Sequence, residues 1–426
     1  MLKLWNRLFL EERPSISLSF FRIAAALTTG FHVIPSFFHL DDTFFHTAFK
    51  TANPAFFPYQ IIELVQKSSD GLVLGFVVLF YLSWLFVLVG LFSQVSCIVL
   101  TVCCYYFYAL NAFAVGALSW DILLVTLFLM CLTPYPGDYF SLDCLRRGDP
   151  RGYQRRRPFF LQRLLQLQIA STYFYTALIK ITARGNWLND NPIYYLMNYP
   201  AEGVTKQFLL KDFLAHQPQL CYGLGILIVC TELALPFLLF YPRTRISAIY
   251  LGFVFHLTLL LTLDVPAIFF FLFPPQLLLF IHPDKIIRWV EQKRAVNQTG
   301  ETAQLVYDGH CRFCRANVQA LKVMDLFGTL KYVDYQACPE ITALHPKLTK
   351  AAAHSQIHLI EPDGRLDGGF FAFRRLCLKL PMLYPLIFLA YFPGSGIFGP
   401  VVYRWVANNR YLFHFNKICQ DNSCFR

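Results

Sequence analysis

The pattern of apolar and polar positions divides the chain into two unlike parts. Up to about residue 282, long apolar runs alternate with short polar or Arg-rich segments, whereas the later residues mix short apolar runs with polar ones. A helix that crosses a bilayer needs about 20 predominantly apolar residues. Runs of about this length fall at 16–38, 71–92, 95–115, 117–133, 159–182, 221–241, 245–264 and 266–282. The pattern therefore predicts a polytopic α-helical membrane domain of about eight spans, followed by a smaller domain of another kind.

The later part alternates expected strands with expected helices. Strand-like runs lie at 304–307, 330–335 and 356–361, and helices are expected at 315–326, from near Pro339, and at 369–379. Such alternation is typical of a small α/β layer. We therefore expect a membrane domain at 1–290, a linker at 291–302 and a small α/β domain at 303–426.

The segment 381–412 is apolar and aromatic, with Gly394-Ser395-Gly396 between two helical stretches. The sequence leaves open whether it packs on the α/β domain or dips into the membrane surface.

Composition and charge support the membrane interpretation. The chain is 56% hydrophobic and only 15% charged, whereas soluble domains carry roughly 25% charged residues. The net charge of +11 raises the question of nucleic acid, but much of the positive charge lies between or beside apolar spans. No basic groove interleaved with aromatic residues stands out, so we expect a bilayer as partner and no nucleic acid.

The Arg-rich loop 134–158 sets the expected orientation, because short loops rich in Lys and Arg remain on the cytoplasmic side. With eight spans, both termini then lie on that side. Met1–Arg13 lacks the pattern of a cleaved signal peptide. We expect a multi-pass protein of a bacterial inner membrane, with its N- and C-termini in the cytoplasm.

A Cys-x-x-Cys pair is the strongest chemical signal. A strand-like run ends at Asp308-Gly309, and Cys311 and Cys314 follow at the start of an expected helix. The N-terminus of a helix favours negative charge and so the nucleophilic thiolate. This predicts Cys311 as the attacking thiol and Cys314, one turn on, as the resolving thiol. The alternatives are two incidental cysteines or half a zinc site, which needs two more ligands; the candidates are Cys338 with His345, and Cys419 with Cys424. Redox use is favoured, and no metal is expected.

Ionisable residues in the expected spans are candidates for function, because they are costly in lipid. Lys180 lies near the outward end of its span, where it is either a general base or a lysine whose ammonium reaches the interface. Periodicity alone favours the second interpretation. For Arg22, Glu232 and His256 the alternatives are a catalytic and a structural role. The structural one, an ion pair of Arg22 with Glu232 and a core histidine with its hydrogen bonds satisfied, is favoured.

The C-terminal part resembles the DCC family of thioredoxin-like proteins. The resemblance covers nearly all of 303–424. It runs through Val306 to Cys314, Asp363-Gly364-Arg365, Gly368-Gly369, Ala372, Tyr403-Arg404 and Ala407 to Tyr411. It implies a thiol-disulfide oxidoreductase that uses Cys311 and Cys314, with a protein or small-molecule thiol or disulfide as substrate. Disulfide exchange itself requires no cofactor.

The membrane part resembles the HTTM family, relatives of the vitamin K-dependent γ-glutamyl carboxylase. The residues that carry this resemblance are Phe20 to Ile23, Ser141 to Asp143, Tyr173 to Lys180 with Trp187, Glu232 with Pro236, Arg243 to Arg245, and Phe255-His256. The resemblance implies Lys180 as a base and a quinone or another lipid as ligand.

These observations leave three hypotheses. The favoured one is a membrane-anchored thiol-disulfide oxidoreductase whose membrane domain has a quinone or lipid as candidate ligand. The alternatives are a carboxylase- or epoxidase-like quinol oxygenase with Lys180 as base, and a membrane maturation factor without chemistry of its own.

Overall fold

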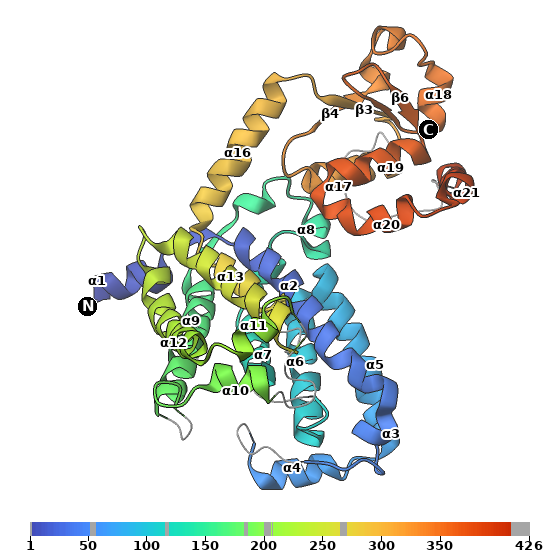
Figure 1. Cartoon of the computed structure of the whole chain (residues 1–426). Helices are drawn as coiled ribbons and strands as arrows, with labels where there is room; N and C mark the ends of the chain where they lie inside the picture. Colours follow the sequence, from blue (N-terminus) through green and yellow to red (C-terminus); the bar gives the residue numbers. More distant parts are fainter. Residues whose placement is uncertain are drawn as a thin grey trace. The chain divides into compact units, whose positions relative to one another are not determined.

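The computed structural model describes residues 2–51, 57–115, 119–182, 186–199, 206, 208–264 and 271–409 (Figure 1). The chain forms two compact units. Unit 1 comprises Met1–Asp143 and Arg155–Pro283, and unit 2 comprises Cys144–Gln154 and Asp284–Arg426.

Unit 1 is built almost entirely from helices. Its first half contains α1 (Leu2–Trp5), α2 (Ile16–Val33), α3 (Leu40–Thr43), α4 (Tyr59–Gln66), α5 (Asp70–Val89), α6 (Ser93–Leu110) and α7 (Ser119–Cys131), with short helical turns at Asn6–Leu10, Ile34–His39 and Tyr135–Gly137. Its second half contains α9 (Phe160–Thr182), α10 (Pro192–Asn198), α11 (Lys211–Ala215), α12 (Pro218–Phe240), α13 (Arg245–Thr262) and α15 (Phe273–Leu278). Helix α8 (Leu142–Arg147) lies at the boundary between the units.

Five helices of the described residues are long and apolar enough to cross a bilayer: Ile16–Thr43, which runs from α2 through α3, and then α5, α6, α12 and α13. The prediction of about eight spans is not confirmed. Helix α7 is too short by itself, and the expected span at 266–282 contains only the six-residue α15 after residues 265–270, which lie outside the described part of the chain.

Helix α9 has 23 residues but is more polar than the five apolar helices. Its glutamines have definite partners: Gln162 and Gln166 donate to the Leu279 carbonyl at 2.6 and 2.7 Å. In return, Gln276 of α15 donates to the Leu165 carbonyl at 2.9 Å. These bonds satisfy buried polar groups where no water is available to do so, and they join α9 to α15.

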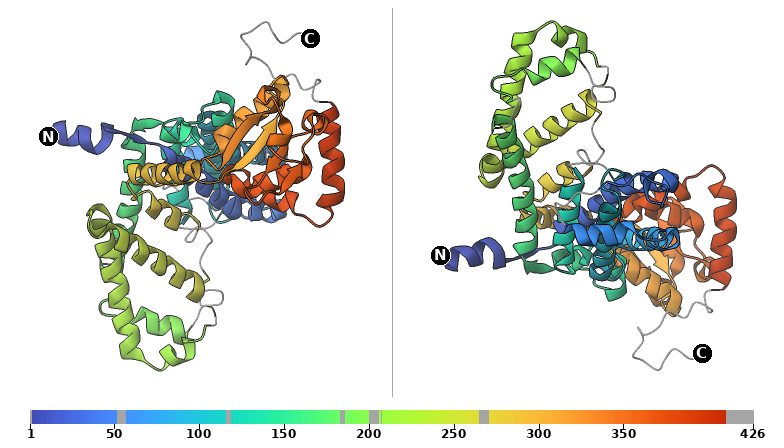
Figure 2. Two further views of the ribbon diagram at one scale, coloured as in Figure 1. Left: turned by 90° about the horizontal axis from the view of Figure 1, so that it is seen from above. Right: turned by 90° about the horizontal axis from the view of Figure 1, so that it is seen from below.

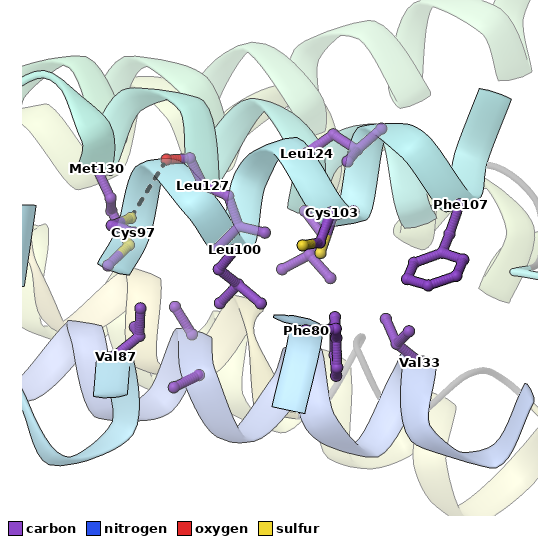
Figure 3. Close-up of a cluster of buried hydrophobic side chains, with 14 of the residues drawn as sticks. Val33, Phe80, Val87, Cys97, Leu100, Cys103, Phe107, Leu124, Leu127 and Met130 are labelled. Carbon is purple, nitrogen blue, oxygen red and sulfur yellow. Dashed lines mark hydrogen bonds between the residues drawn. The ribbon is translucent and has the colours of Figure 1, made fainter. Parts of the chain in front are cut away.

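The main apolar core of unit 1 lies between α2, α5, α6 and α7 (Figure 3). Phe80, Leu100, Phe107 and Leu124 are all fully buried there. Cys97 and Cys103 lie in the same core, as expected for cysteines that act as small apolar side chains. Figure 2 shows a second group of helices formed by the green and yellow segments, in which α12 packs against α9 and α13.

Arg22 corrects one expectation. It is buried in α2 and donates to the carbonyls of Pro136, at 2.7 Å, and Phe140. The predicted ion pair with Glu232 is therefore wrong, because carbonyls of the loop after α7 take up the guanidinium. The pattern also gave no sign of the antiparallel pairing of β1 (Glu12–Pro14) with β2 (Arg156–Pro158).

Unit 2 contains a four-stranded sheet in the order β4-β3-β5-β6. Its strands are β3 (Ala303–Tyr307), β4 (Leu330–Asp334), β5 (His358–Ile360) and β6 (Leu366–Gly368). Strand β3 is parallel to β4 and antiparallel to β5, and β5 is antiparallel to β6. The predicted α/β layer is confirmed, and its strands and first helix lie close to the expected positions.

The helices of unit 2 are α16 (Pro283–Thr299), α17 (Arg312–Met324), α18 (Lys350–Ser355), α19 (Phe370–Lys379), α20 (Ile387–Ala390) and α21 (Ser395–Asn408), with 3-10 turns at Gly152–Gln154, Tyr335–Ala337, Ile341–Ala343 and Pro381–Leu386. Most of the expected linker at 291–302 is thus part of α16. A helix from near Pro339 is not formed, since this stretch contains a single 3-10 turn before α18.

Alternating side chains of β3 enter two cores. Leu305 packs with Val318 of α17 and Leu376 of α19, whereas Val306 packs with Ala353 of α18. One face of the sheet is thus covered by α17 and α19 and the other by α18 and the turns before it. This arrangement presents the loop after β3 at the edge where α17 begins (Figure 1).

Gly90 gives a test of the packing around Arg22. Its φ is +69°, and a Cβ there would overlap Ser141 Cβ and come within 2.6 Å of Arg22 Nη1. We expect Gly90→Ala to cost about 2 kcal/mol or more, from backbone strain and displacement of the buried arginine, and so to lower the Tm in detergent. Gly75→Ala is the matched control, because nothing lies within 4 Å of its Cβ position. Equal Tm values for the two variants would contradict the description of this site.

Candidate redox site

Cys311 is the N-cap residue of α17. Its φ and ψ of −77° and 117° are extended, and its Sγ accepts a hydrogen bond from the backbone N–H of Cys314 at 3.3 Å. An N-cap side chain that accepts such a bond lies among the unsatisfied N–H groups of the first helical turn. The predicted position of Cys311 at the helix N-terminus is confirmed, and this position favours a thiolate.

Gly309 holds the loop against β4. Its N–H donates to Asp334 Oδ1 at 2.9 Å, and a Cβ at this position would overlap the Asp334 carboxylate. The two residues meet because β3 and β4 are parallel, so that their carboxyl ends lie at the same edge of the sheet. The Asp334 carboxylate also caps the following turn by accepting from Gln336 N–H at 3.0 Å.

Asp308 is a buried carboxylate, 5% exposed, just before this glycine. Its Oδ1 accepts from the backbone N–H of His310 at 3.0 Å and from Gln336 Nε2 at 3.3 Å. Its Oδ2 lies 3.4 Å from His354 Nδ1, and that nitrogen lies 3.1 Å from the Tyr335 hydroxyl. We call Asp308, Tyr335, Gln336 and His354 the Asp308 cluster.

An apolar cavity of about 700 Å³ opens beside the redox pair. Cys314 and Asp308 line it together with apolar side chains of α17, α19 and the helices that follow, among them Leu321, Phe373 and Phe398. Cys311 is 8% exposed, and Cys314 is partly exposed. The two thiol-bearing residues, a buried carboxylate and an apolar cavity therefore share one corner of unit 2.

The zinc alternative finds no support in these positions. Within the described ranges, no group of three or more His, Cys, Asp or Glu side chains is arranged to hold a metal ion. Cys338 Sγ lies 3.5 Å from the Asp334 carbonyl, and His345 Nε2 lies 3.0 Å from that of Gly364. Cys419 and Cys424 lie outside the described residues.

The ionisable residues of the membrane domain form a separate polar group. Lys180 Nζ lies 2.7 and 2.9 Å from the two carboxylate oxygens of Glu232, and 5.3 Å from the centre of the Trp187 ring. The Tyr173 hydroxyl lies 2.6 Å from His256 Nε2. Glu232 and His256 are both buried, and Nδ1 of His256 has no hydrogen-bond partner among the described residues.

The structure thus sorts the predicted site residues into three places. Asp308, Gly309 and Cys311 lie in the loop after β3, and Cys314 lies in the first turn of α17. Lys180 and Glu232 are an ion pair, with His256 bonded to Tyr173, and Arg22 lies apart among loop carbonyls. Sequence reasoning missed Asp334, which ends β4 beside the redox loop, and the rest of the Asp308 cluster. The end of a strand parallel to β3 is a usable signal for Asp334, whereas nothing in the sequence distinguishes His354.

These features define a class: a multi-pass membrane protein whose C-terminal α/β domain presents a pair of cysteines at a helix N-terminus. Residues 11–285 match the model of the HTTM domain, and residues 305–415 match that of the DCC1-like thiol-disulfide oxidoreductases. The first match spans more than half of the chain, so the protein belongs to the HTTM family. Both predicted resemblances and their order are confirmed. No curated protein and no solved structure matches the chain.

The Lys180–Glu232 pair can be tested with a double-mutant cycle. We expect Glu232→Leu to cost about 2 kcal/mol, because it leaves a largely buried ammonium without its partner, and so to lower the Tm in detergent by about 4–8 °C. Lys180→Met combined with Glu232→Leu should recover most of this loss. Additive losses in the double variant would show that the two side chains are not coupled.

Proposed function

We propose that the protein is a membrane-bound thiol-disulfide oxidoreductase in which Cys311 attacks and Cys314 resolves. The observation that carries this proposal is the position of Cys311 as N-cap of α17, with its sulfur accepting the Cys314 N–H. The family match of residues 305–415 supports a redox enzyme of this kind. The order β3–α17–β4, then the β5–β6 pair and α19, supports the expected thioredoxin-like fold.

The reaction needs only the two thiols and a substrate disulfide. The Cys311 thiolate attacks one sulfur of the substrate and forms a mixed disulfide, while the other substrate sulfur leaves as a thiolate. Cys314 then loses its proton and attacks Cys311 Sγ, which releases the second substrate sulfur. The substrate gains two electrons and becomes two thiols, and the protein is left with a Cys311–Cys314 disulfide.

Asp308 is the proposed acceptor of the Cys314 proton. Its carboxylate lines the same cavity as Cys314 and is buried, and Gln336 and His354 hold it in place. A general base must reach the proton directly or through one water molecule. We propose that the Asp308 carboxylate reaches the Cys314 thiol through one water molecule, without any residue from the membrane domain.

The proposed location is the inner membrane, with unit 2 on the cytoplasmic side, as the Arg-rich loop predicts. Cytosolic thiols are kept reduced, and redox-active pairs there are transient and catalytic. In this compartment the pair acts as a reductant of its substrate and is then restored by cellular thiols.

The alternative of a quinol oxygenase rests on Lys180. Its ammonium is in an ion pair with Glu232, so it has to release a proton before it can act as a base. Disulfide exchange also needs a deprotonated thiol, but the helix N-terminus at Cys311 favours the thiolate, and we therefore rank the oxygenase second. Binding of a quinone or lipid by the membrane domain is a proposal that rests on the family resemblance.

The redox pair is tested first by titration of the detergent-purified protein in thiol/disulfide buffers, with alkylation and mass measurement. We expect one reversible two-electron couple between about −120 and −270 mV. Cys314→Ser should retain a substrate as a stable mixed disulfide on Cys311, whereas the control Cys338→Ser should behave like the unaltered protein. Failure of the two cysteines to form a disulfide at any potential would reject the proposal.

The role of Asp308 is tested by the rate at which the mixed disulfide is resolved. We expect Asp308→Asn to slow this step about 100-fold at neutral pH, the loss typical of a removed general base, and to leave a rate that rises with pH as hydroxide replaces the carboxylate. Asp363→Asn, an exposed turn carboxylate, is the control. An unchanged pH–rate profile in Asp308→Asn would remove Asp308 from the mechanism.

A further inference from the structure

Unit 2 carries an apolar hairpin that its own fold does not cover. The hairpin spans Pro381–Asn408 and consists of a 3-10 turn with α20, and then α21, with a bend of 116° between the two arms. Figures 1 and 2 show α21 at the edge of the unit, where its Tyr403 hydroxyl accepts from the Ile357 N–H beside β5 at 3.4 Å. The hairpin exposes Phe388, Leu389, Phe392, Ile397, Phe398 and Trp405.

This exposure is far from that of an ordinary soluble surface. Phe388 is 86% exposed and Ile397 73% exposed, and a soluble monomer rarely leaves large contiguous apolar patches open to water. The two arms together are apolar enough to count as a broken span or re-entrant segment. The basic side chains Lys379 and Arg404 lie near the two ends of the hairpin, as is typical of segments at a lipid surface.

Unit 2 is covalently linked to a domain that crosses a bilayer. The HTTM region ends at residue 285, and the 17-residue α16 leads from Pro283 toward β3. At 1.5 Å per residue this helix is only about 25 Å long. Unit 2 is therefore always tethered within a short distance of the bilayer that its own chain crosses.

The hairpin also forms the mouth of the cavity beside the redox pair. Phe392, Phe398 and Val402 line the cavity and are 61–71% exposed. Residues that line a cavity and are exposed as well mark its opening, so the cavity opens on the apolar surface of the hairpin. Cys314 and Asp308 line the same cavity. Its volume of about 700 Å³ falls within the range of roughly 300–1,000 Å³ found for ligand sites.

We propose that this cavity binds the alkyl or isoprenoid chain of a molecule dissolved in the bilayer, which enters through the hairpin as the hairpin lies in the lipid surface. The bound chain places the head of the molecule beside Cys314. Its reaction there rests on the proposed function, whereas the binding does not. The substrate class is thus a lipid-phase molecule, and water-soluble disulfides bypass the cavity.

The test uses the full chain in nanodiscs that contain a phospholipid with a diazirine on one acyl chain. After irradiation, mass spectrometry should find the probe on peptides of both α17 and α21. Ala320→Trp fills the cavity from α17 and should abolish labelling of that helix. The matched control is Ala316→Trp, at an exposed alanine of the same helix that does not line the cavity, and it should be labelled like the unaltered protein.

A second variant tests the route of entry. Phe388→Asp with Ile397→Asp alters exposed hairpin residues that do not line the cavity, and it should reduce labelling of both helices. The proposal is overturned if α17 is not labelled, or if Ala320→Trp leaves its labelling unchanged. It is also overturned if the hairpin is not labelled by the probe and instead crosslinks to the hairpin of a second copy of the protein.

One further measurement separates this proposal from the proposed function. The Ala320→Trp variant should still exchange with oxidised glutathione, because this disulfide is water-soluble and bypasses the cavity. Alkylation of Cys311 and Cys314 measures this exchange. A cysteine pair that never cycles while α17 is labelled by the lipid would reject the oxidoreductase and leave the lipid site in place. Normal cycling of the cysteine pair without labelling of α17 would reject the lipid site and leave the oxidoreductase in place.

Discussion

The contact between Gly309 and Asp334 is the constraint on which the redox site depends. Parallel pairing brings the ends of β3 and β4 to one edge of the sheet, and the Asp334 carboxylate fills the space that a side chain at Gly309 would need. The loop is thereby held close to β4, and its next residues reach the start of α17. Cys311 is the N-cap of this helix. The position of the pair thus follows from the sheet.

In the membrane domain, several buried polar side chains have definite partners that join its segments. Gln162 and Gln166 satisfy a carbonyl beyond α15, Arg22 satisfies carbonyls of a loop, and Lys180 neutralises Glu232. Without water, these bonds decide which helices meet. They also explain why a helix as polar as α9 lies in the middle of an apolar domain: its polar side chains are the links to its neighbours.

How much could be predicted from the sequence differs between the two parts. The cysteine pair, the strand before it and the helix after it were predictable, because an Asp-Gly turn and a Cys-x-x-Cys motif are local signals. The eight-span count was not, because hydropathy cannot separate a span from a short helix such as α7 or from the Pro274-Pro275 segment of α15. The partner of Glu232 was assigned wrongly, because Arg22 and Lys180 are equivalent in a hydropathy pattern and differ only in what surrounds them. His354 could not be found, since its role arises from the packing of α18 beside the loop.

The surroundings of four other cysteines differ from those of Cys311 and Cys314. Cys97, Cys103 and Cys104 are buried in the apolar core of the membrane domain, where a thiol behaves as a small hydrophobic group. In unit 2, burial raises the pKa of the Cys377 thiol, which is fully enclosed between α19 and the sheet. A raised pKa disfavours the thiolate and so the attack on a disulfide. Cys311 and Cys314 differ because they lie at a helix N-terminus and beside a cavity that a substrate can enter. The proposed selectivity among the thiols of this chain is therefore a matter of position, since burial in a core disfavours the thiolate and the start of a helix favours it.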